Sequence, residues 1–212
     1  MTDSQSPPAA DRRTQLLGIA RRRFTADGYG KTPVSAIVRE AGVAQGTFYL
    51  YFKNKQALLT ELRREVFRDY VSTLRKQAAR PCPADERLAR VATAMVAAVS
   101  RNLDLERVFR LAESAEETLR VAREGRRRLA MVAEEFLQDG VDEGIFRVTD
   151  PHRTAGFVIT LYDHILYEAW VYAPADIDAV HTASLRFVLQ GVGVSPERVD
   201  ALVAASAGWR RA

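Results

Sequence analysis

Apolar residues recur at helical spacing along nearly all of the 212 residues of this chain, and this feature restricts the fold more than any other. Leu16, Leu17, Ala20 and Phe24, for example, fall on one face of a helix with 3.6 residues per turn. No stretch shows the alternation of a strand between hairpin turns. The sequence therefore predicts an all-α protein.

Glycine and proline divide this pattern into ten predicted helices. Gly28 and Gly42 follow the first two, since glycine adopts the left-handed conformation that ends many helices. The Thr32 hydroxyl and Pro33 are expected to open the second helix, and Asn54 is expected to cap the fourth. The predicted helices are 11–27, 33–41, 45–51, 54–79, 84–101, 104–112, 115–140, 151–173, 176–190 and 196–206.

The second and third of these helices predict a helix-turn-helix. They are short, and the tight turn between them contains Gly42, as is typical of this DNA-binding motif. We therefore expect a DNA-binding domain at 11–55, preceded by a disordered lead-in at 1–10. The remainder, 56–212, is expected to be a second helical domain, and the long helix at 54–79 links the two.

The composition is typical of a soluble globular protein. Hydrophobic residues make up 47% of the chain, and no run approaches the roughly 20 apolar residues of a membrane span. The first ten residues lack the basic start and apolar stretch of a secretory signal, so we expect no membrane partner and a cytoplasmic location. The single cysteine, Cys82, lies between two prolines and is best explained as an inert loop thiol.

Basic residues are concentrated in the amino-terminal part of the chain, although the net charge of the whole is only +4. Residues 1–80 hold 15 Lys or Arg against 7 Asp or Glu, whereas residues 81–212 hold 16 against 20. A basic segment on a mildly acidic remainder indicates a polyanionic partner such as nucleic acid. Arg-rich helices also serve merely as solvated surfaces, so the charge alone leaves both interpretations open.

A dense set of residues in the first quarter of the chain forms a specific motif. Its members are Phe24, Gly28-Tyr29, Thr32-Pro33-Val34, Ile37, Ala41-Gly42-Val43, Gly46-Thr47-Phe48-Tyr49, Tyr51-Phe52, Lys53-Asn54-Lys55 and Leu58-Leu59. Together they resemble the TetR family of ligand-responsive transcriptional regulators. The remaining helices resemble that family only in number, length and lack of pattern.

The resemblance implies that the helix at 45–51 enters the major groove of DNA. The implied contacts are to base edges from Gln45, Gly46 and Thr47, and to phosphates from Tyr49, Tyr51 and Lys55. Phe48 and Phe52 are expected to pack in the core. The chain departs from the family at Ala44, where serine or threonine is usual, so this helix lacks a side-chain cap worth about 1 kcal/mol. Val38, where alanine is common, is a milder departure.

Physical reasoning agrees with this assignment, because the second helix of the motif presents its first residues to the bases. Gln45 can pair with adenine through two hydrogen bonds, and Thr47 can contact a thymine methyl group. Lys53 and Lys55 are expected to contact phosphates, as is Thr32 at a helix start. Such contacts position a protein on DNA without reading its sequence.

Apolar residues wrap too far around two carboxy-terminal helices for each to cover a single core. These helices, at 151–173 and 176–190, therefore need a second apolar partner. By resemblance to the family, the last two long helices pair with their copies in a homodimer, whose two-fold symmetry suits a palindromic operator in double-stranded DNA. A larger monomeric core is the alternative.

A small hydrophobic effector is expected to bind among the middle helices, where apolar side chains with a few polar tips would line a pocket. The candidate lining residues are Met95, Val99, Phe109, Arg110, Phe136, Phe157, Leu161, Tyr162, His164 and Trp170. Taken singly, each is better explained by core packing. Effector binding would tilt the helix at 54–79 and move the recognition helices out of register, which would release DNA and end repression.

Ionisable residues inside the apolar helix at 151–173 need partners, because buried charges are costly unless paired. Asp163 and His164 lie close to Glu168 along this helix. The pattern is compatible with a mutual hydrogen bond, a solvated edge at the dimer seam or a ligand contact. Arg110 also allows two interpretations. If its side chain points inward, an anionic lipophilic effector is plausible; if it points outward, neutral aromatic or hydrophobic compounds are as plausible.

No motif of an enzyme, a metal site or a cofactor site is found in the sequence. His152, His164, His181 and the lone cysteine lack metal-ligand spacing, and residues 191–193 lack the third glycine of a nucleotide loop. Ser184 lies near His181 without an identifiable acid, which is a generic pairing. We therefore expect no catalytic residue, metal or cofactor. An architectural DNA-binding protein without ligand control and a helical enzyme are the alternatives to a ligand-responsive regulator.

Overall fold

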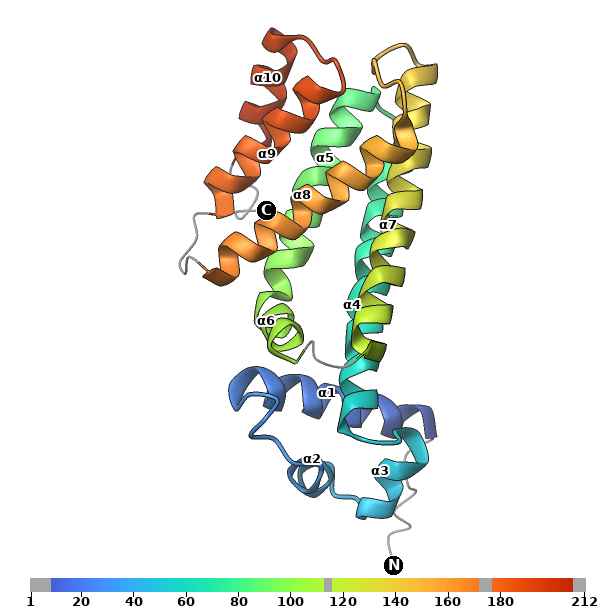
Figure 1. Ribbon diagram of the computed structural model, residues 1–212, viewed down its shortest axis with the longest axis vertical. Helices are drawn as coiled ribbons and strands as arrows, with labels where there is room; N and C mark the ends of the chain where they lie inside the picture. The colour runs from blue at the N-terminus through green and yellow to red at the C-terminus, as the bar shows by residue number, and fades with distance from the viewer. Residues whose placement is uncertain (1–8, 113–115, 172–176, 208–212) are drawn as a thin grey trace, which may run out of the picture. The chain divides into compact units, whose positions relative to one another are not determined.

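The computed structural model describes residues 9–112, 116–171 and 177–207, and it confirms the all-α prediction. Ten helices and no strand are found among these residues (Figure 1). The helices are α1 Ala9–Ala26, α2 Val34–Glu40, α3 Gln45–Tyr51, α4 Lys55–Ala78, α5 Ala84–Arg101, α6 Leu103–Leu111, α7 Glu116–Asp142, α8 Pro151–Val171, α9 Ile177–Gly191 and α10 Pro196–Ser206. None of the described helices is apolar enough over a sufficient length to cross a membrane.

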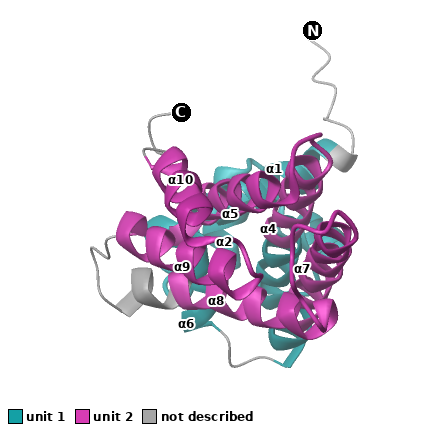
Figure 2. Cartoon of the chain, turned by 90° about the horizontal axis from the view of Figure 1, so that it is seen from above, with its two compact units in different colours: residues 1–65, 104–121 teal, residues 66–103, 122–212 magenta. Residues whose placement is uncertain are grey.

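The chain forms two compact units, which Figure 2 shows in different colours. The first comprises Met1–Glu65 and Asp104–Val121, and the second comprises Val66–Leu103 and Ala122–Ala212. The helices α4 and α7 each contribute residues to both units. These units are defined by how closely their residues pack and not by function. The boundary between a DNA-binding and a second domain at residues 55 and 56 therefore stays a prediction. Most of the expected lead-in lies outside the described residues.

In the first unit, α1 contacts α2, and α2 contacts α3. Phe24 of α1 and Phe48 of α3 are fully buried, and the Phe24 ring meets the ring of Tyr29 edge-on with centroids 5.1 Å apart. The turns after α1 and α2 contain Gly28 at φ 88° and Gly42 at φ 65°, a region that residues with a Cβ atom rarely adopt. Glycine therefore shapes both turns as predicted.

Helix capping follows the prediction at α4 but not at α2. The Asn54 side-chain oxygen accepts a hydrogen bond from the Ala57 N–H at 2.8 Å, which confirms the cap of α4. The expected Thr32 cap of α2 is wrong, because Pro33 occupies the cap position and has no side-chain cap bond. The Thr32 hydroxyl instead donates to the Gly28 carbonyl at 2.9 Å, closing the preceding turn.

In the second unit, α9 contacts α5, α8 and α10, and α10 contacts α5. Val96, Ile165 and Ile177 form a buried cluster on α5, α8 and α9. His181 of α9 is also buried, and its Nε2 lies 3.2 Å from the Thr93 hydroxyl of α5. Burial lowers the pKa of His181, because the interior disfavours the charged imidazolium. The histidine thus belongs to the packing of the unit rather than to a metal site.

Close packing between α4 and α7 depends on Gly125. A Cβ atom at this position would overlap the Phe67 ring, with Cδ2 at 2.5 Å. We expect Gly125→Ala to lower the free energy of unfolding by about 1–3 kcal/mol, because overpacking forces side chains from their preferred rotamers. Chemical denaturation of the purified protein measures this change.

Overpacking by Gly125→Ala lowers the free energy of unfolding, whereas the higher helix propensity of alanine alone would raise it. Gly18→Ala in α1 is the control, since the nearest atom to its Cβ would be Arg22 Nη1 at 3.9 Å. There alanine should stabilise the helix by up to about 1 kcal/mol. Adding Phe67→Leu to Gly125→Ala should recover part of the loss. A stabilised Gly125→Ala variant would contradict the close approach.

Candidate DNA-binding site

The first turn of α3 presents an open surface. Gln45 and Gly46 are exposed, and Thr47 is half-buried. A Cβ atom at Gly46 would meet nothing within 4 Å, so another molecule can approach the backbone closely here. Ala44 is the cap residue and makes no side-chain cap bond, as expected for alanine. The Thr47 N–H donates to the Ala44 carbonyl at 2.9 Å.

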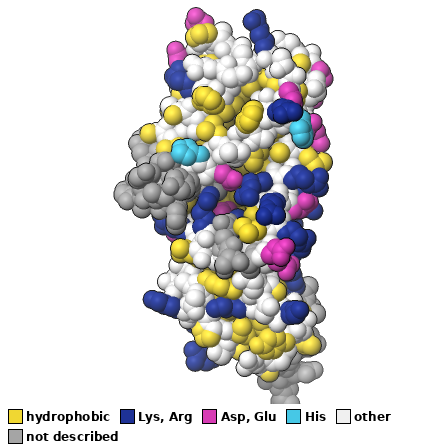
Figure 3. All heavy atoms as spheres, in the orientation of Figure 1, with side chains coloured by type: hydrophobic (Ala, Val, Ile, Leu, Met, Phe, Trp, Pro, Cys, Tyr) yellow, Lys and Arg dark blue, Asp and Glu magenta, His cyan; other side chains and the backbone are white. Residues whose placement is uncertain are grey.

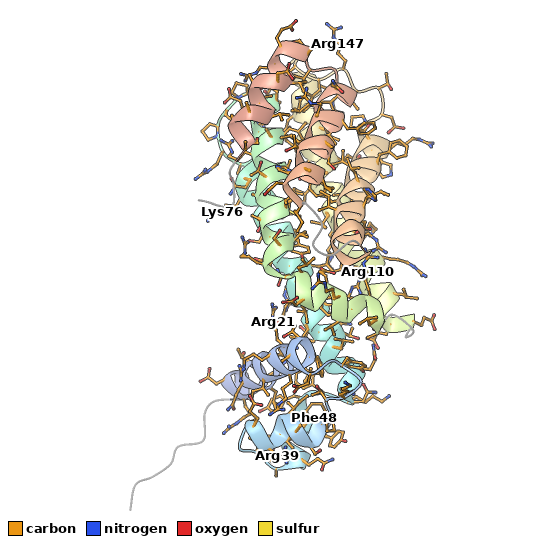
Figure 4. All side chains as sticks on the ribbon, turned by 90° about the vertical axis from the view of Figure 1, so that its left-hand side faces the viewer. Arg21, Arg39, Phe48, Lys76, Arg110 and Arg147 are labelled. Atoms are coloured by element: carbon orange, nitrogen blue, oxygen red, sulfur yellow. The ribbon has the colours of Figure 1, made fainter. Side chains whose placement is uncertain are left out.

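The opposite side of α3 is anchored in the core. Phe48 and Phe52 are buried, with ring centroids 5.6 Å apart, which confirms the packing role expected for both. The Arg13 guanidinium of α1 lies over the Phe52 ring at 5.4 Å from its centroid. Figure 4 shows Phe48 among the helices of this unit. The recognition surface is therefore carried on a rigid support.

Later residues of α3 extend the exposed face. The exposed fraction is 51% for Tyr49 and 81% for Leu50, while Tyr51 is half-buried and Lys53 is exposed. Leu50 was not expected at this surface, because apolar residues are usually assigned to the core. Its position four residues after Gly46 places it on the same helix face, and that spacing was the available signal.

Lys55 does not extend into solvent as a phosphate contact would. Its ammonium donates to the carbonyl of Tyr29 at 2.7 Å and to that of Thr32 at 3.0 Å. The same ammonium lies 4.3 Å from the centroid of the Tyr29 ring. Burial lowers the pKa of Lys55. In this arrangement Lys55 joins the start of α4 to the loop between α1 and α2, and so positions the motif.

Gln56 continues this connection and was not predicted from the sequence. Its side-chain oxygen accepts a hydrogen bond from the Tyr29 hydroxyl at 2.8 Å, and its Nε2 donates to the Thr118 hydroxyl at 2.5 Å. Three segments of the first unit, the α1–α2 loop, α4 and α7, therefore meet at one glutamine. Because the partners are 27 and 62 residues away in sequence, no local pattern could show this.

Other polar residues of the motif are engaged within the protein. Thr32 is 1% exposed, so its hydroxyl faces the turn rather than a phosphate. Arg22 and Arg23 both donate to Glu40, at 2.9 and 2.5 Å, and these bonds hold the pKa of Glu40 below its ordinary value. The exposed cations of this unit that have no ion pair among the described residues include Lys31, Arg39 and Lys53. Figure 4 shows Arg39 at the edge of the unit.

The residues expected to line an effector pocket have different environments. Met95, Val99 and Phe136 are buried in the second unit, and Phe109 is buried in the first. Tyr162 packs against the cluster of Val96, Ile165 and Ile177, and burial raises the pKa of its hydroxyl well above the usual range. These five of the ten candidates therefore show the core packing that explains each residue singly.

The remaining candidates are less buried. Leu161 and Arg110 are half-buried, His164 is exposed, and Phe157 is 73% exposed, so neither of the last two lines an enclosed cavity of the single chain. The side chains of Trp170 and Glu168 lie outside the described residues.

Asp163 forms an ion pair with Arg126 of α7, with an oxygen to nitrogen distance of 3.5 Å. This carboxylate therefore has a partner on a neighbouring helix. In the described part of the chain, no three His, Cys, Asp or Glu residues gather in a way that could hold a metal ion.

Two family models match the chain in succession. Residues 16–62 match the model described as bacterial regulatory proteins of the tetR family. Residues 81–167 match the model described as the tetracyclin repressor-like C-terminal domain. The two spans together include more than half of the chain, and the first contains the whole helix-turn-helix.

Individual relatives agree with these matches. The chain is 36% identical over 77 residues to the fatty acid metabolism regulator protein of Bacillus subtilis, which is 36% of this chain and 40% of that protein. It is 26% identical over 180 residues to the transcriptional regulator AcrR of Shigella flexneri, which is 80% of this chain and 83% of that protein. The solved structure of FadR from Bacillus subtilis in complex with stearoyl-CoA has the same fold, with a TM-score of 0.71, 24% identity and coverage of 84% of this chain and 98% of that chain. Motif, fold and family models agree that the chain belongs to the TetR family of bacterial regulatory proteins, which are DNA-binding transcriptional regulators and not enzymes.

Proposed function

We propose that this protein is a dimeric repressor that binds a palindromic operator and is released by a small hydrophobic effector. The observation that carries the proposal is the exposed first turn of α3, with Gln45 and Gly46 open to solvent above a buried Phe48. A rigid helix that presents its first residues outward is what reading of the major groove requires. Such a protein acts in the cytoplasm, where bacterial operators lie.

Base contacts are assigned to the open face of α3. Gln45 pairs with adenine, and Thr47 and Leu50 contact thymine methyl groups. Gly46 lets the helix backbone approach the DNA, and the hydroxyls of Tyr49 and Tyr51 contact phosphates. Leu50 is our addition, based on its 81% exposure.

Phosphate contacts are assigned to exposed cations of the first unit. Lys53 is retained from the sequence, and Lys31 and Arg39 are added because both are exposed and have no ion pair among the described residues. Lys55 and Thr32 are given positioning roles instead, since their polar groups bond to backbone carbonyls. In this proposal Lys53 contacts a DNA phosphate, whereas Lys55 holds the helix-turn-helix in position.

The DNA-binding proposal is tested by selecting bound duplexes from random DNA with the purified protein at stated salt. We expect a palindrome with half-sites one or more helical turns apart. On that operator, Lys53→Gln should weaken binding and reduce the slope of log affinity against log salt by about 1.8, because each of the two subunits loses one phosphate contact. Filter binding at several salt concentrations measures the slope.

The control is Arg147→Gln, which removes an exposed positive charge from the other compact unit. It should leave the slope unchanged, because Arg147 is assigned no contact with DNA. Equal slopes for wild type and Lys53→Gln would refute the phosphate role of Lys53. Failure to enrich any sequence would favour an architectural DNA-binding protein.

The dimer interface is assigned to α8 and α9. Phe157 of α8 is 73% exposed and Phe187 of α9 is 69% exposed, which is unusual for large apolar side chains. Figure 3 shows further hydrophobic side chains over these helices. A second copy of the chain that packs against this face would bury both rings in an isologous interface.

The effector is assigned to the apolar interior of the second unit, near Met95, Val99 and Phe136. The relative FadR binds stearoyl-CoA, according to its solved complex, which supports a lipophilic effector here. Because α4 contributes to both units, its tilt would carry an effector-induced change towards the motif. Equal operator affinity with and without saturating stearoyl-CoA or other lipophilic compounds would favour the ligand-independent alternative.

A further inference from the structure

A large open groove lies within the second unit, on a face of α5 that the proposed function does not use. It has a volume of about 930 Å³ and is walled by the last turns of α4, by α5 and by α10. Its lining includes Thr93, Ala94 and Ala97 of α5, whereas Met95 and Val99 of the same helix are not part of it. The groove is therefore a site separate from the apolar interior assigned to the effector.

Positive charge dominates the lining of this groove. Lys76 of α4, Arg80 just after that helix and Arg101 of α5 contribute side chains, and none of the three forms an ion pair with any described residue. Lys76 is labelled in Figure 4 at the edge of the unit. Like charges that converge without a counter-ion repel one another, so the groove favours a negatively charged occupant.

The acidic residue of the lining already has an ion-pair partner within the protein. Glu86 accepts a hydrogen bond from Arg198 at 2.7 Å, and Arg198 also donates to the buried Asp85 at 2.6 Å. One positive charge faces two negative charges here, so the cluster of Arg198, Asp85 and Glu86 is negative by one charge and offsets only one of the other cations of the groove. These are Lys76, Arg80, Arg101 and Arg90, so the charge that remains is positive.

Arg90 shows that hydrogen bonds in the groove are incomplete. Its guanidinium contacts the Cys82 thiol rather than a carboxylate, and its buried Nε has no hydrogen-bond partner among the described residues. Gln77, which also lines the groove, has a buried side-chain oxygen to which no described residue donates a hydrogen bond. Buried polar atoms are normally satisfied, so these two indicate a missing polar ligand or bound water.

The lining also contains small apolar side chains, most of them alanines, which we call the alanine floor. Ala89, Ala94, Ala97, Ala201 and Leu202 belong to it, so a flat organic group could lie there without clashing with long side chains. Arginine guanidinium groups bind phosphate through paired hydrogen bonds and also stack on planar rings. An occupant would therefore combine several negative oxygens with an apolar or planar body.

We propose that this groove binds a phosphate-bearing organic anion of the nucleoside-diphosphate class. The phosphates contact Lys76, Arg90 and Arg101, and the planar part lies on the alanine floor. The site goes beyond the proposed function, because neither DNA binding nor a hydrophobic effector requires it. It would make the regulator responsive to a second, polar compound.

The proposal is tested by titrating the full-length protein with ADP in a calorimeter at low salt. We expect saturable binding of one ADP per chain. The variant Lys76→Gln/Arg101→Gln should weaken this binding by at least about tenfold, because two charge-assisted contacts are lost. Both residues are exposed, so the variant should keep the melting temperature of the wild type.

The matched control is Arg75→Gln/Arg147→Gln, which removes the same charge from exposed positions outside the groove. It should leave ADP affinity within about twofold of the wild type. Lys53→Gln tests whether ADP binds the DNA-binding surface instead, and it should also leave ADP affinity unchanged. Adenosine without phosphate should bind much more weakly than ADP.

Several results would overturn the proposal. These are a lack of saturable ADP binding, equal weakening by the groove and control variants, loss of binding in Lys53→Gln, and binding of adenosine as tight as that of ADP. Preference for an acidic peptide over ADP would assign the groove to a protein partner. Operator affinity, measured on the same variants, reports separately on the proposed function, so failure of one proposal is distinguishable from failure of the other.

Discussion

Phe187→Glu should convert the proposed dimer into a monomer and weaken operator binding by about a hundredfold. A charge at a side chain that is 69% exposed in the single chain hardly affects its folding, but it would be buried against a second copy. Two linked recognition helices bind far more tightly than one, because the second contact is intramolecular. Solution mass by light scattering, together with operator titration, measures both effects. The mass should fall to that of one 23.7 kDa chain.

Leu111→Glu is the control for this experiment. Leu111 of α6 is 77% exposed, so the substitution places the same charge on an equally exposed apolar residue of the other compact unit. It should leave the mass of the dimer unchanged. A dimeric Phe187→Glu variant with full operator affinity would exclude this face of α9 as the interface.

The helices could be predicted closely because their boundaries are locally encoded. The bounds of α3, α5 and α10 equal the predicted ones, and each of α5 and α10 begins beside a proline. Periodicity identifies the apolar face of a helix, and turn residues mark where the helix ends. Neither signal depends on the rest of the fold.

The direction of individual side chains could not be predicted in the same way. Leu50 and Phe157 are apolar, yet they are 81% and 73% exposed, because each lies on a helix face that no described element covers. Thr32 is polar, yet it is buried, since its hydroxyl closes the turn at Gly28. Composition ranks residues by average burial, whereas these positions depend on which elements pack together.

The direction of the Lys55 side chain, within the candidate site, could not be predicted from the sequence either. From the sequence the residue is one of two lysines beside the recognition helix, and both were expected on phosphates. Its carbonyl partners on Tyr29 and Thr32 are 26 and 23 residues away, so only the fold distinguishes it from Lys53. The two lysines are separated by one residue, yet substitution of Lys53 is expected to reduce the salt dependence of DNA binding and substitution of Lys55 to leave it unchanged.

Lys55→Met should weaken operator binding by at least about thirtyfold and lower the free energy of unfolding by about 3 kcal/mol. Methionine replaces the apolar stem of lysine but lacks the ammonium and cannot donate, so two carbonyls lose a charged hydrogen-bond partner. The loop between α1 and α2 would then no longer be held at the start of α4, and α2 would lose its fixed orientation. Thermal denaturation and operator titration measure the two effects.

The salt dependence of the residual binding decides between the two roles of Lys55. A positioning residue lowers affinity at every salt concentration by the same factor, so the slope of log affinity against log salt stays that of the wild type. Lys53→Met, the matched variant two residues earlier, should reduce the slope by about 1.8, since both subunits lose a phosphate contact, and leave the free energy of unfolding unchanged. A reduced slope with unchanged stability in Lys55→Met would show that Lys55 leaves the Tyr29 and Thr32 carbonyls when DNA binds and contacts a phosphate, as the sequence first indicated.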